Sequence, residues 1–185
     1  MKNLIVTGYA AHELGIFDQK HQALKYIRKA CIQKLVPLIE DGVEWVITPG
    51  QYGFDLWAAE IAIKLRDKQF HHLKVSVIHA YANQEQNWND NKKEYWQRIK
   101  SKLDHFDIVS KQEYLGPWQF QARDQLLFNK SDGMLLFYDA EAAESKVRYM
   151  REKALKKADS ENYSIITITA DDIQMIVEEE MQNID

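Results

Sequence analysis

Short apolar runs alternate along the whole chain with longer segments in which apolar residues recur at helical spacing. The first run, Leu4-Ile5-Val6, is uninterrupted and ends at Thr7-Gly8. An unbroken apolar run of this length is typical of a strand that is buried on both faces. We therefore predict six strands, at residues 4–6, 45–48, 75–78, 106–109, 134–138 and 165–168.

The segments between these runs favour helices, because their apolar residues return every three or four positions. Pro37 is expected to kink the first helix or to end it early, and Gly42 is a natural C-terminal stop. The Asn- and Gln-rich stretch 81–91 is predicted to be a loop. The predicted helices span about residues 19–41, 54–68, 92–103, 116–130, 146–158 and 170–181.

Strands that alternate with helices predict an α/β fold with a mostly parallel sheet. With right-handed crossovers, residues 1–185 would form a single, doubly wound, Rossmann-like domain. Such sheets bind ligands at the carboxyl ends of their strands, near the point where the strand order reverses. The loops to search are those after Val6, Ile47, Ile78, Val109 and Tyr138.

Charge and composition narrow the classes of partner. The net charge is −4, but six of the 28 acidic residues lie in 171–185, which leaves 22 acids against 24 bases in the body. A body so nearly neutral gives no general electrostatic reason to bind nucleic acid. The only cysteine, Cys31, falls in a helical pattern and is expected to be a buried thiol in a reducing compartment. We expect a cytoplasmic protein, since no apolar run is long enough for a membrane span or a signal peptide.

The loop after the second strand carries the strongest chemical signal. Gly50-Gln51-Tyr52-Gly53 lies between a strand and a helix, where free backbone N–H groups favour a phosphate or a carboxylate. Asp55, in the first turn of that helix, is a candidate acceptor for ribose hydroxyls, or else an ordinary helix cap. The loop lacks both the P-loop and the Gly-x-Gly-x-x-Gly patterns.

Other candidate ligand contacts lie after the first strand and in the second half of the chain. Thr7-Gly8-Tyr9 brings a glycine to a strand exit, where it forms a ligand loop or simply a tight turn. Arg123 is a candidate phosphate clamp, or else a surface ion pair with Asp124 or Glu113. Trp88 or Trp118 could stack on a base. The six histidines show no metal-ligand spacing, so no metal site is expected.

A set of short motifs in these loops resembles one known family. The sequence resembles the YpsA-type family of small proteins from Gram-positive bacteria, and the match keeps its order over essentially the whole chain. That family belongs to the SLOG superfamily of Rossmann-like domains, shared with DNA-processing protein A and the LOG phosphoribohydrolases. The matching blocks are Thr7-Gly8-Tyr9, Glu13-Leu14-Gly15-Ile16-Phe17, Gly50-Gln51-x-Gly53-x-Asp55-x-Trp57-x-x-Glu60, Asn87-Trp88, Pro117-x-Gln119, Ser131-Asp132-Gly133 and Leu136-x-Tyr138-Asp139.

Departures from the relatives' motifs limit what the resemblance implies. Tyr52 stands where the DNA-processing loop has a basic residue, which weakens a DNA-binding function. Trp57 stands where the LOG motif has its acid, and Glu60 lies one helical turn beyond. Asp124 stands where an Asn is usual in the closer family. The glycine-containing loop expected after Asp139 is replaced by Ala142-Ala143-Glu144-Ser145-Lys146.

The resemblance implies binding or sensing of a nucleotide-derived ligand such as ADP-ribose, NAD or a nucleoside phosphate, with no other cofactor required. The candidate ligand contacts are Thr7, Gly8, Tyr9, Gly50, Gln51, Gly53, Asp55, Trp88 and Arg123. One alternative is a nucleotide N-glycoside hydrolase, with Asp55 or Glu60 as its acid/base group. Another is an adaptor linked to cell division or stress physiology, which would use the acidic last helix and a protein partner. Assembly into a homo-oligomer stays open.

Overall fold

All six predicted strands are present in the computed structural model, which describes residues 1–184. They form one sheet in which every neighbouring pair is parallel, in the order β4-β3-β2-β1-β5-β6. The interior strands consist of nearly continuous buried residues, as expected for a parallel sheet that is covered on both faces. The strands are β1 Asn3–Gly8, β2 Trp45–Thr48, β3 Lys74–Tyr81, β4 His105–Ser110, β5 Gly133–Phe137 and β6 Ser164–Ile168.

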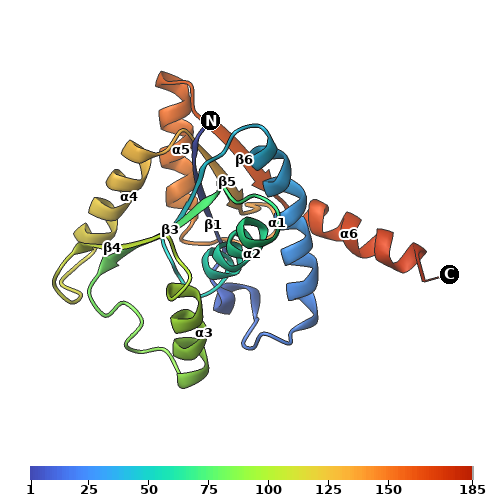
Figure 1. The fold of residues 1–185 in the computed structure, drawn as a ribbon, viewed down its shortest axis with the longest axis horizontal. Helices are drawn as coiled ribbons and strands as arrows, with labels where there is room; N and C mark the ends of the chain where they lie inside the picture. Colours follow the sequence, from blue (N-terminus) through green and yellow to red (C-terminus); the bar gives the residue numbers. More distant parts are fainter. Residues whose placement is uncertain (185) are drawn as a thin grey trace.

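The helices cover both faces of the sheet, as Figure 1 shows. The chain passes from β1 through β2 and β3 to β4 in one direction, and α4 then carries it back across the sheet to β5. Right-handed crossovers consequently put α4 and α5 on the face opposite α1 and α2. The domain is therefore doubly wound and Rossmann-like, as the sequence predicts. The helices are α1 Gln22–Glu40, α2 Phe54–Lys68, α3 Asp90–Lys100, α4 Trp118–Lys130, α5 Arg148–Ser160 and α6 Ala170–Gln182.

Capping residues explain where several helices begin and end. The Asn89 side chain accepts a hydrogen bond from the Lys92 amide at the start of α3, and Thr169 and Asp172 form a capping box at the start of α6. Gly42 follows the end of α1 with φ +114°, in the left-handed region that glycine tolerates. These ends match the sequence pattern to within a few residues.

The structure differs from the sequence pattern in two places, and of the two outcomes expected at Pro37, a kink or an early end, the early end is wrong. Pro37 does not end the first helix early, because α1 continues through it to Glu40 and buries Leu35 and Ile39 on the sheet side. Packing of this apolar face outweighs the one intrahelical hydrogen bond that the proline removes. In addition, a 3₁₀ helix, η1 Ala11–Leu14, follows β1 where the sequence predicts no element.

The core lies between the sheet and its two helical layers. Cys31 is fully buried there, and burial raises the pKa of its thiol to about 12, which fits the expected core thiol. None of the helices within residues 1–184 combines the length and the apolar character needed to cross a bilayer. The last helix, α6, lies at the outside of the fold and reaches toward the C-terminus (Figure 1).

Candidate functional site

The predicted site loops gather at the carboxyl edge of the sheet. β1 lies between β2 and β5, and this is where the strand order reverses. The loops after β1, β2, β3 and β5 all emerge at this edge, because parallel strands end on the same side. Thr7, Gly8, Tyr9 and the Gly50–Gly53 loop are therefore brought together.

Asp55 ties the first two of these loops to each other. One carboxylate oxygen accepts hydrogen bonds from Thr7 Oγ1 at 2.7 Å and from the Gly8 amide at 3.3 Å. The other oxygen accepts the Gln51 amide at 3.0 Å. Burial raises the pKa of this carboxyl to about 6, although these donors and the charge of Arg123 act to lower it. Asp55 is thus a buried residue that connects two loops by hydrogen bonds. The pKa of its carboxyl group lies near neutral pH.

Gly50 and Gly53 give the loop after β2 a path that other residues could not follow. Gly50 has φ +75°, and a Cβ atom there would come within 2.5 Å of Val77 and 2.8 Å of His79. Gly53 has φ +145° and crosses the backbone of Ala10 and Ala11 so closely that a Cβ would overlap it. Within the described chain the amides of Gly50 and Gly53 donate to no backbone carbonyl. The start of α2 therefore offers donors to an anion.

Arg123 reaches the site from α4, on the opposite face of the sheet. Its Nε and Nη2 atoms donate to Asp124 Oδ1 at 3.1 and 2.8 Å, and Lys153 binds the other oxygen of that carboxylate at 2.8 Å. This ion pair is buried, not on the surface as one alternative held. Nη1 of Arg123 has no hydrogen-bond partner among residues 1–184. Nη1 is thus a buried guanidinium nitrogen whose donors are unused within the described chain.

Two further side chains belong to the site and were missed in the sequence. Thr48 ends β2 and His79 lies in β3; both are almost completely buried. Thr48 Oγ1 and His79 Nε2 make no hydrogen bond of good geometry in the described part of the chain, although the Gly50 backbone lies close enough to His79 to act on the pKa of the imidazole. Burial, followed by the charges of Arg123 and Lys100, lowers the pKa of His79 to about 3, so the imidazole is neutral. The only signal in the sequence for including Thr48 and His79 in the site was that each lies at the end of a predicted strand.

Tyr9 and Trp88 are held by contacts within the protein. The Tyr9 ring packs against Phe137 and Tyr138. Its hydroxyl lies 2.9 Å from the carbonyls of Asp139 and Ala143, either of which can accept its one proton, and accepts the Asp139 amide at 2.9 Å. Trp88 is half-buried against the Tyr52 ring, at 5.7 Å between centroids. Both residues lie at the predicted edge, where they fix loops to one another.

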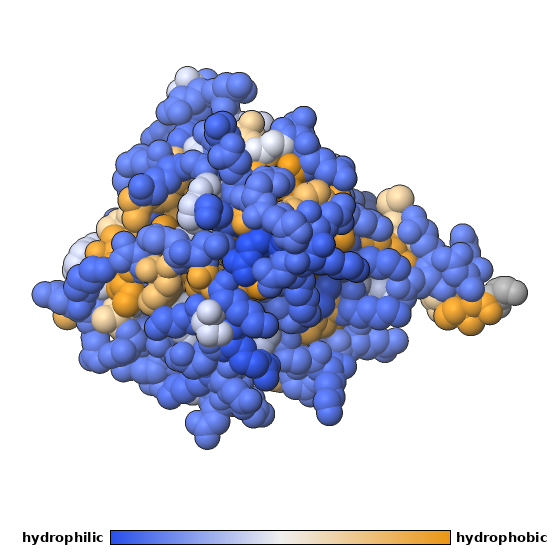
Figure 2. All heavy atoms as spheres, in the orientation of Figure 1, coloured by the Kyte–Doolittle hydropathy of each residue, from blue (hydrophilic) through white to orange (hydrophobic). Residues whose placement is uncertain are grey.

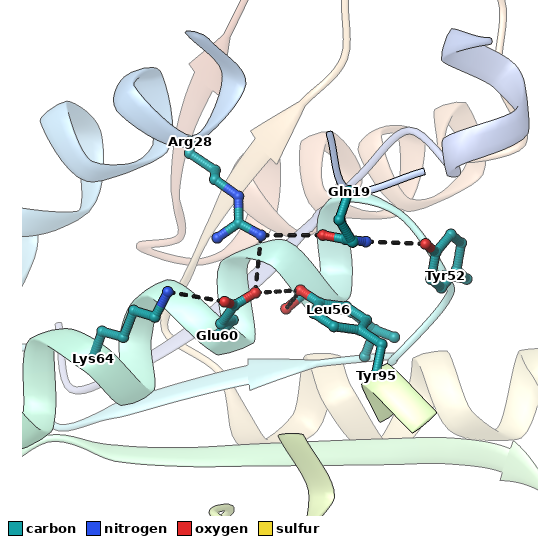
Figure 3. Close-up of polar contacts among 7 residues, drawn as sticks. All are labelled: Gln19, Arg28, Tyr52, Leu56, Glu60, Lys64 and Tyr95. Atoms are coloured by element: carbon teal, nitrogen blue, oxygen red, sulfur yellow. Dashed lines mark hydrogen bonds and ion pairs between the residues drawn. The ribbon is translucent and has the colours of Figure 1, made fainter. Parts of the chain in front are cut away.

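Glu60 lies away from this cluster, on the side of α2 that faces α1 and α3 (Figure 3). Its carboxylate accepts hydrogen bonds from Arg28, Lys64 and the Tyr95 hydroxyl. Burial acts to raise the pKa of Glu60, but these three donors outweigh it and lower the pKa to about 2. A carboxyl group with so low a pKa is a poor proton donor at neutral pH.

A cleft lies at the opposite edge of the sheet. It has a volume of about 590 Å³, and lies between α4 and the amino-terminal halves of β2, β3 and β4. None of the candidate residues lines it. No three His, Cys, Asp or Glu side chains in residues 1–184 are grouped so that they could hold a metal ion.

Comparison with known proteins gives a consistent relationship over the whole chain. The family model described as the YspA SLOG family matches residues 4–173. The chain is 41% identical to a UPF0398 protein of Brevibacillus brevis, over 100% of this chain and 97% of the relative. It is 43% identical to a UPF0398 protein of Lysinibacillus sphaericus, over 96% and 98%, and 42% identical to one of Bacillus cereus, over 99% and 98%. The chain therefore belongs to the YpsA-type SLOG family.

Proposed function

We propose that this protein binds or senses a nucleotide-derived ligand, such as ADP-ribose, NAD or a nucleoside phosphate, at the carboxyl edge of its sheet. One observation carries the proposal. Thr48, His79 and Arg123 come from three different elements, and each has a buried polar atom without a partner in residues 1–184. Leaving a buried polar group unpaired costs about 1–3 kcal/mol, so three unpaired atoms on elements that border the same edge of the sheet favour a missing ligand.

The donors of this cluster suit an anionic group. Arg123 Nη1 supplies a charged donor, and the amides at the start of α2 add the positive end of a helix dipole. The Thr48 hydroxyl and the neutral His79 ring can exchange hydrogen bonds with sugar or phosphate oxygens. Asp55 holds the two loops in place beside them.

The test is calorimetric titration with ADP-ribose, NAD and nucleoside monophosphates, together with thermal unfolding. A ligand at about 100 times its Kd should raise the free energy of unfolding by roughly 2.7 kcal/mol. Arg123→Gln should weaken binding at least about tenfold, because a charged hydrogen bond contributes about 1.5–3 kcal/mol. Arg151→Gln removes the same charge from an exposed position on α5 and should leave affinity unchanged. Absence of binding by every ligand of the panel would refute the proposal.

A second candidate function is hydrolysis of a nucleotide N-glycosidic bond. It is favoured by the pKa of Asp55, which at about 6 suits a general acid. Asp55→Asn should abolish release of ribose 5-phosphate and free base, whereas Glu60→Gln should not. Turnover that survives Asp55→Asn would remove this candidate.

A role as an adaptor in the cytoplasm, with a cell-division protein as partner, would use α6. This helix combines acidic residues with exposed Met175 and Met181. Figure 2 shows apolar atoms at its far end on an otherwise mostly hydrophilic face. Deletion of residues 171–185 should then abolish capture of the partner while ligand binding persists; unchanged capture would exclude this surface.

A further inference from the structure

The loop between β4 and α4 is fixed by one buried side chain, Gln119. Its Oε1 atom accepts the amides of Leu115 and Gly116 at 2.7 and 3.3 Å. Its Nε2 atom donates to Ser110 Oγ and to the Glu113 carbonyl, both at 3.0 Å. Gln119 is completely buried, so every hydrogen bond of its amide is used to hold this loop. The glutamine of the Pro117-x-Gln119 motif therefore fixes the conformation of this loop.

The end of β3 holds the same loop from the other side. The Ala82 amide donates to the Gln112 carbonyl at 2.9 Å, and the Asn83 side chain donates to Glu113 Oε1 at 3.0 Å. A loop with this many internal ties has little conformational entropy left to lose when a ligand binds. It is a preorganised part of the carboxyl edge.

The side chain that this loop presents is aromatic and open to solvent. Tyr114 is 51% exposed, and its ring lies 5.2 Å from Tyr81 and 6.1 Å from Phe120. Phe120 and Tyr81 are themselves in edge-to-face contact at 5.7 Å. Three rings thus form a cluster with one exposed member, which we call the Tyr114 platform (Tyr81, Tyr114 and Phe120).

The Tyr114 platform adjoins Arg123, the arginine of the candidate site. The Arg123 guanidinium lies over the Phe120 ring at 5.3 Å, and its Nη1 atom is unpartnered in residues 1–184. The two aromatics among the candidate ligand contacts are already packed within the protein, Trp88 on Tyr52 and Tyr9 on Phe137. An anionic group at Arg123 would therefore place the rest of its molecule within reach of Tyr114.

We propose that the Tyr114 platform binds the planar base of the ligand whose anionic group is held at Arg123, so that the site selects nucleotides over sugar phosphates. This inference rests on the proposed function. The exposed Tyr114 ring is separated from Arg123 by the Phe120 ring alone. An aromatic ring can stack on a base while a nearby charged donor binds the phosphate of the same nucleotide.

The test compares adenosine 5′-monophosphate with ribose 5-phosphate, which shares its sugar and phosphate but has no base. Wild-type protein should bind the nucleotide more tightly. Tyr114→Ala should weaken nucleotide binding roughly 5- to 150-fold and leave binding of ribose 5-phosphate unchanged, since a base stacked on an aromatic side chain contributes about 1–3 kcal/mol. Tyr149→Ala is the matched control, because Tyr149 is 50% exposed on α5. It should affect neither ligand.

The other possible results distinguish failure of the Tyr114 platform from failure of the proposed function. Equal affinities of wild-type protein for both probes would overturn the platform and leave the proposed function standing. Nucleotide affinity that is unchanged by Tyr114→Ala, with an altered sedimentation coefficient, would make the platform a protein interface instead. Failure of both probes, and of the wider ligand panel, would overturn both proposals.

Discussion

Two opposite effects act on the pKa of Asp55. Three donors from the loops after β1 and β2 bind its carboxylate, which favours the charged form. The surrounding protein excludes water, which favours the neutral form, and burial is the stronger influence on its pKa. The two effects leave a structural carboxyl group whose charge changes near neutral pH.

Titration of Asp55 should appear in the stability of the protein. The native pKa of about 6 exceeds the ordinary value of 3.8, so the folded state holds the proton more strongly. As pH falls from 7 to 4, the free energy of unfolding of the wild type should rise relative to Asp55→Asn by roughly 2–3 kcal/mol. Urea unfolding of both proteins across this range measures the difference. Neutral His79 acts in the opposite direction in both proteins and cancels; a constant difference would contradict the pKa.

Gly50 offers a test of packing at the loop after β2. Both Gly50 and Gly15 have positive φ, +75° and +68°, but only at Gly50 would a Cβ meet other atoms within 4 Å. Gly15→Ala should cost about 1–2 kcal/mol of stability from backbone strain alone. Gly50→Ala should cost about 1–3 kcal/mol more from the clash with Val77 and His79. Denaturant unfolding that gives equal losses would mean that the loop relaxes freely.

At the scale of elements, Glu60 joins three helices. Its carboxylate on α2 receives Arg28 from α1 and Tyr95 from α3 (Figure 3). Arg28 also donates to Gln19, whose amide donates to the Tyr52 hydroxyl at 2.9 Å. The helical layer on this face is thereby connected to the glycine loop of the candidate site.

Removing the carboxylate should therefore damage packing between helices. Glu60→Ala removes the charged acceptor of the Tyr95 hydroxyl and of the half-buried Arg28, and should lower the free energy of unfolding by about 2–3 kcal/mol. Lys64→Ala removes only the exposed partner of the same carboxylate and should cost about 0.5 kcal/mol or less. Chemical denaturation of the two variants makes the comparison. Equal effects would show that the network contributes little.

The strands were predictable because their signal is local. Runs such as Met134–Phe137 are apolar without interruption, and a parallel sheet requires such runs. The unpartnered atoms of Thr48 and His79 were not predictable, since they depend on which strands become neighbours. Arg123 was identified as a candidate, but its burial beside Asp124 follows from the crossing of α4 over the sheet. The local sequence pattern is therefore enough to predict the strands, whereas the candidate site depends on which strands and helices pack against one another.

At the scale of the whole molecule, the layers differ in how firmly they are held. In α2 most residues are buried against the sheet, whereas in α6 only Ile176 is buried. α6 is otherwise attached to α1 by ion pairs such as those of Glu180 with Lys25 and Lys29. Exposed pairs of this kind contribute little to stability.

This difference predicts separate opening of α6. In native-state hydrogen exchange, the amides of α6 should exchange through a local opening of lower free energy than the amides of α2, which should exchange only on global unfolding. Raising the salt concentration should widen the gap, because it screens the pairs with α1. Equal exchange free energies in the two helices would show that α6 belongs to the same cooperative unit as the core.

The place of β1 in the strand order sets a sequence of events during synthesis. β1 carries Thr7 and Gly8 and pairs on one side with β2, but its other neighbour, β5, is made only after most of the chain has left the ribosome. Until then, one edge of the strand that bears the candidate site has no partner, and exposed strand edges promote aggregation. One of the two central strands of the finished sheet is thus an edge strand until β5 is made, although the residues that join its ligand loops, Thr7, Gly8, Gln51 and Asp55, all precede β5.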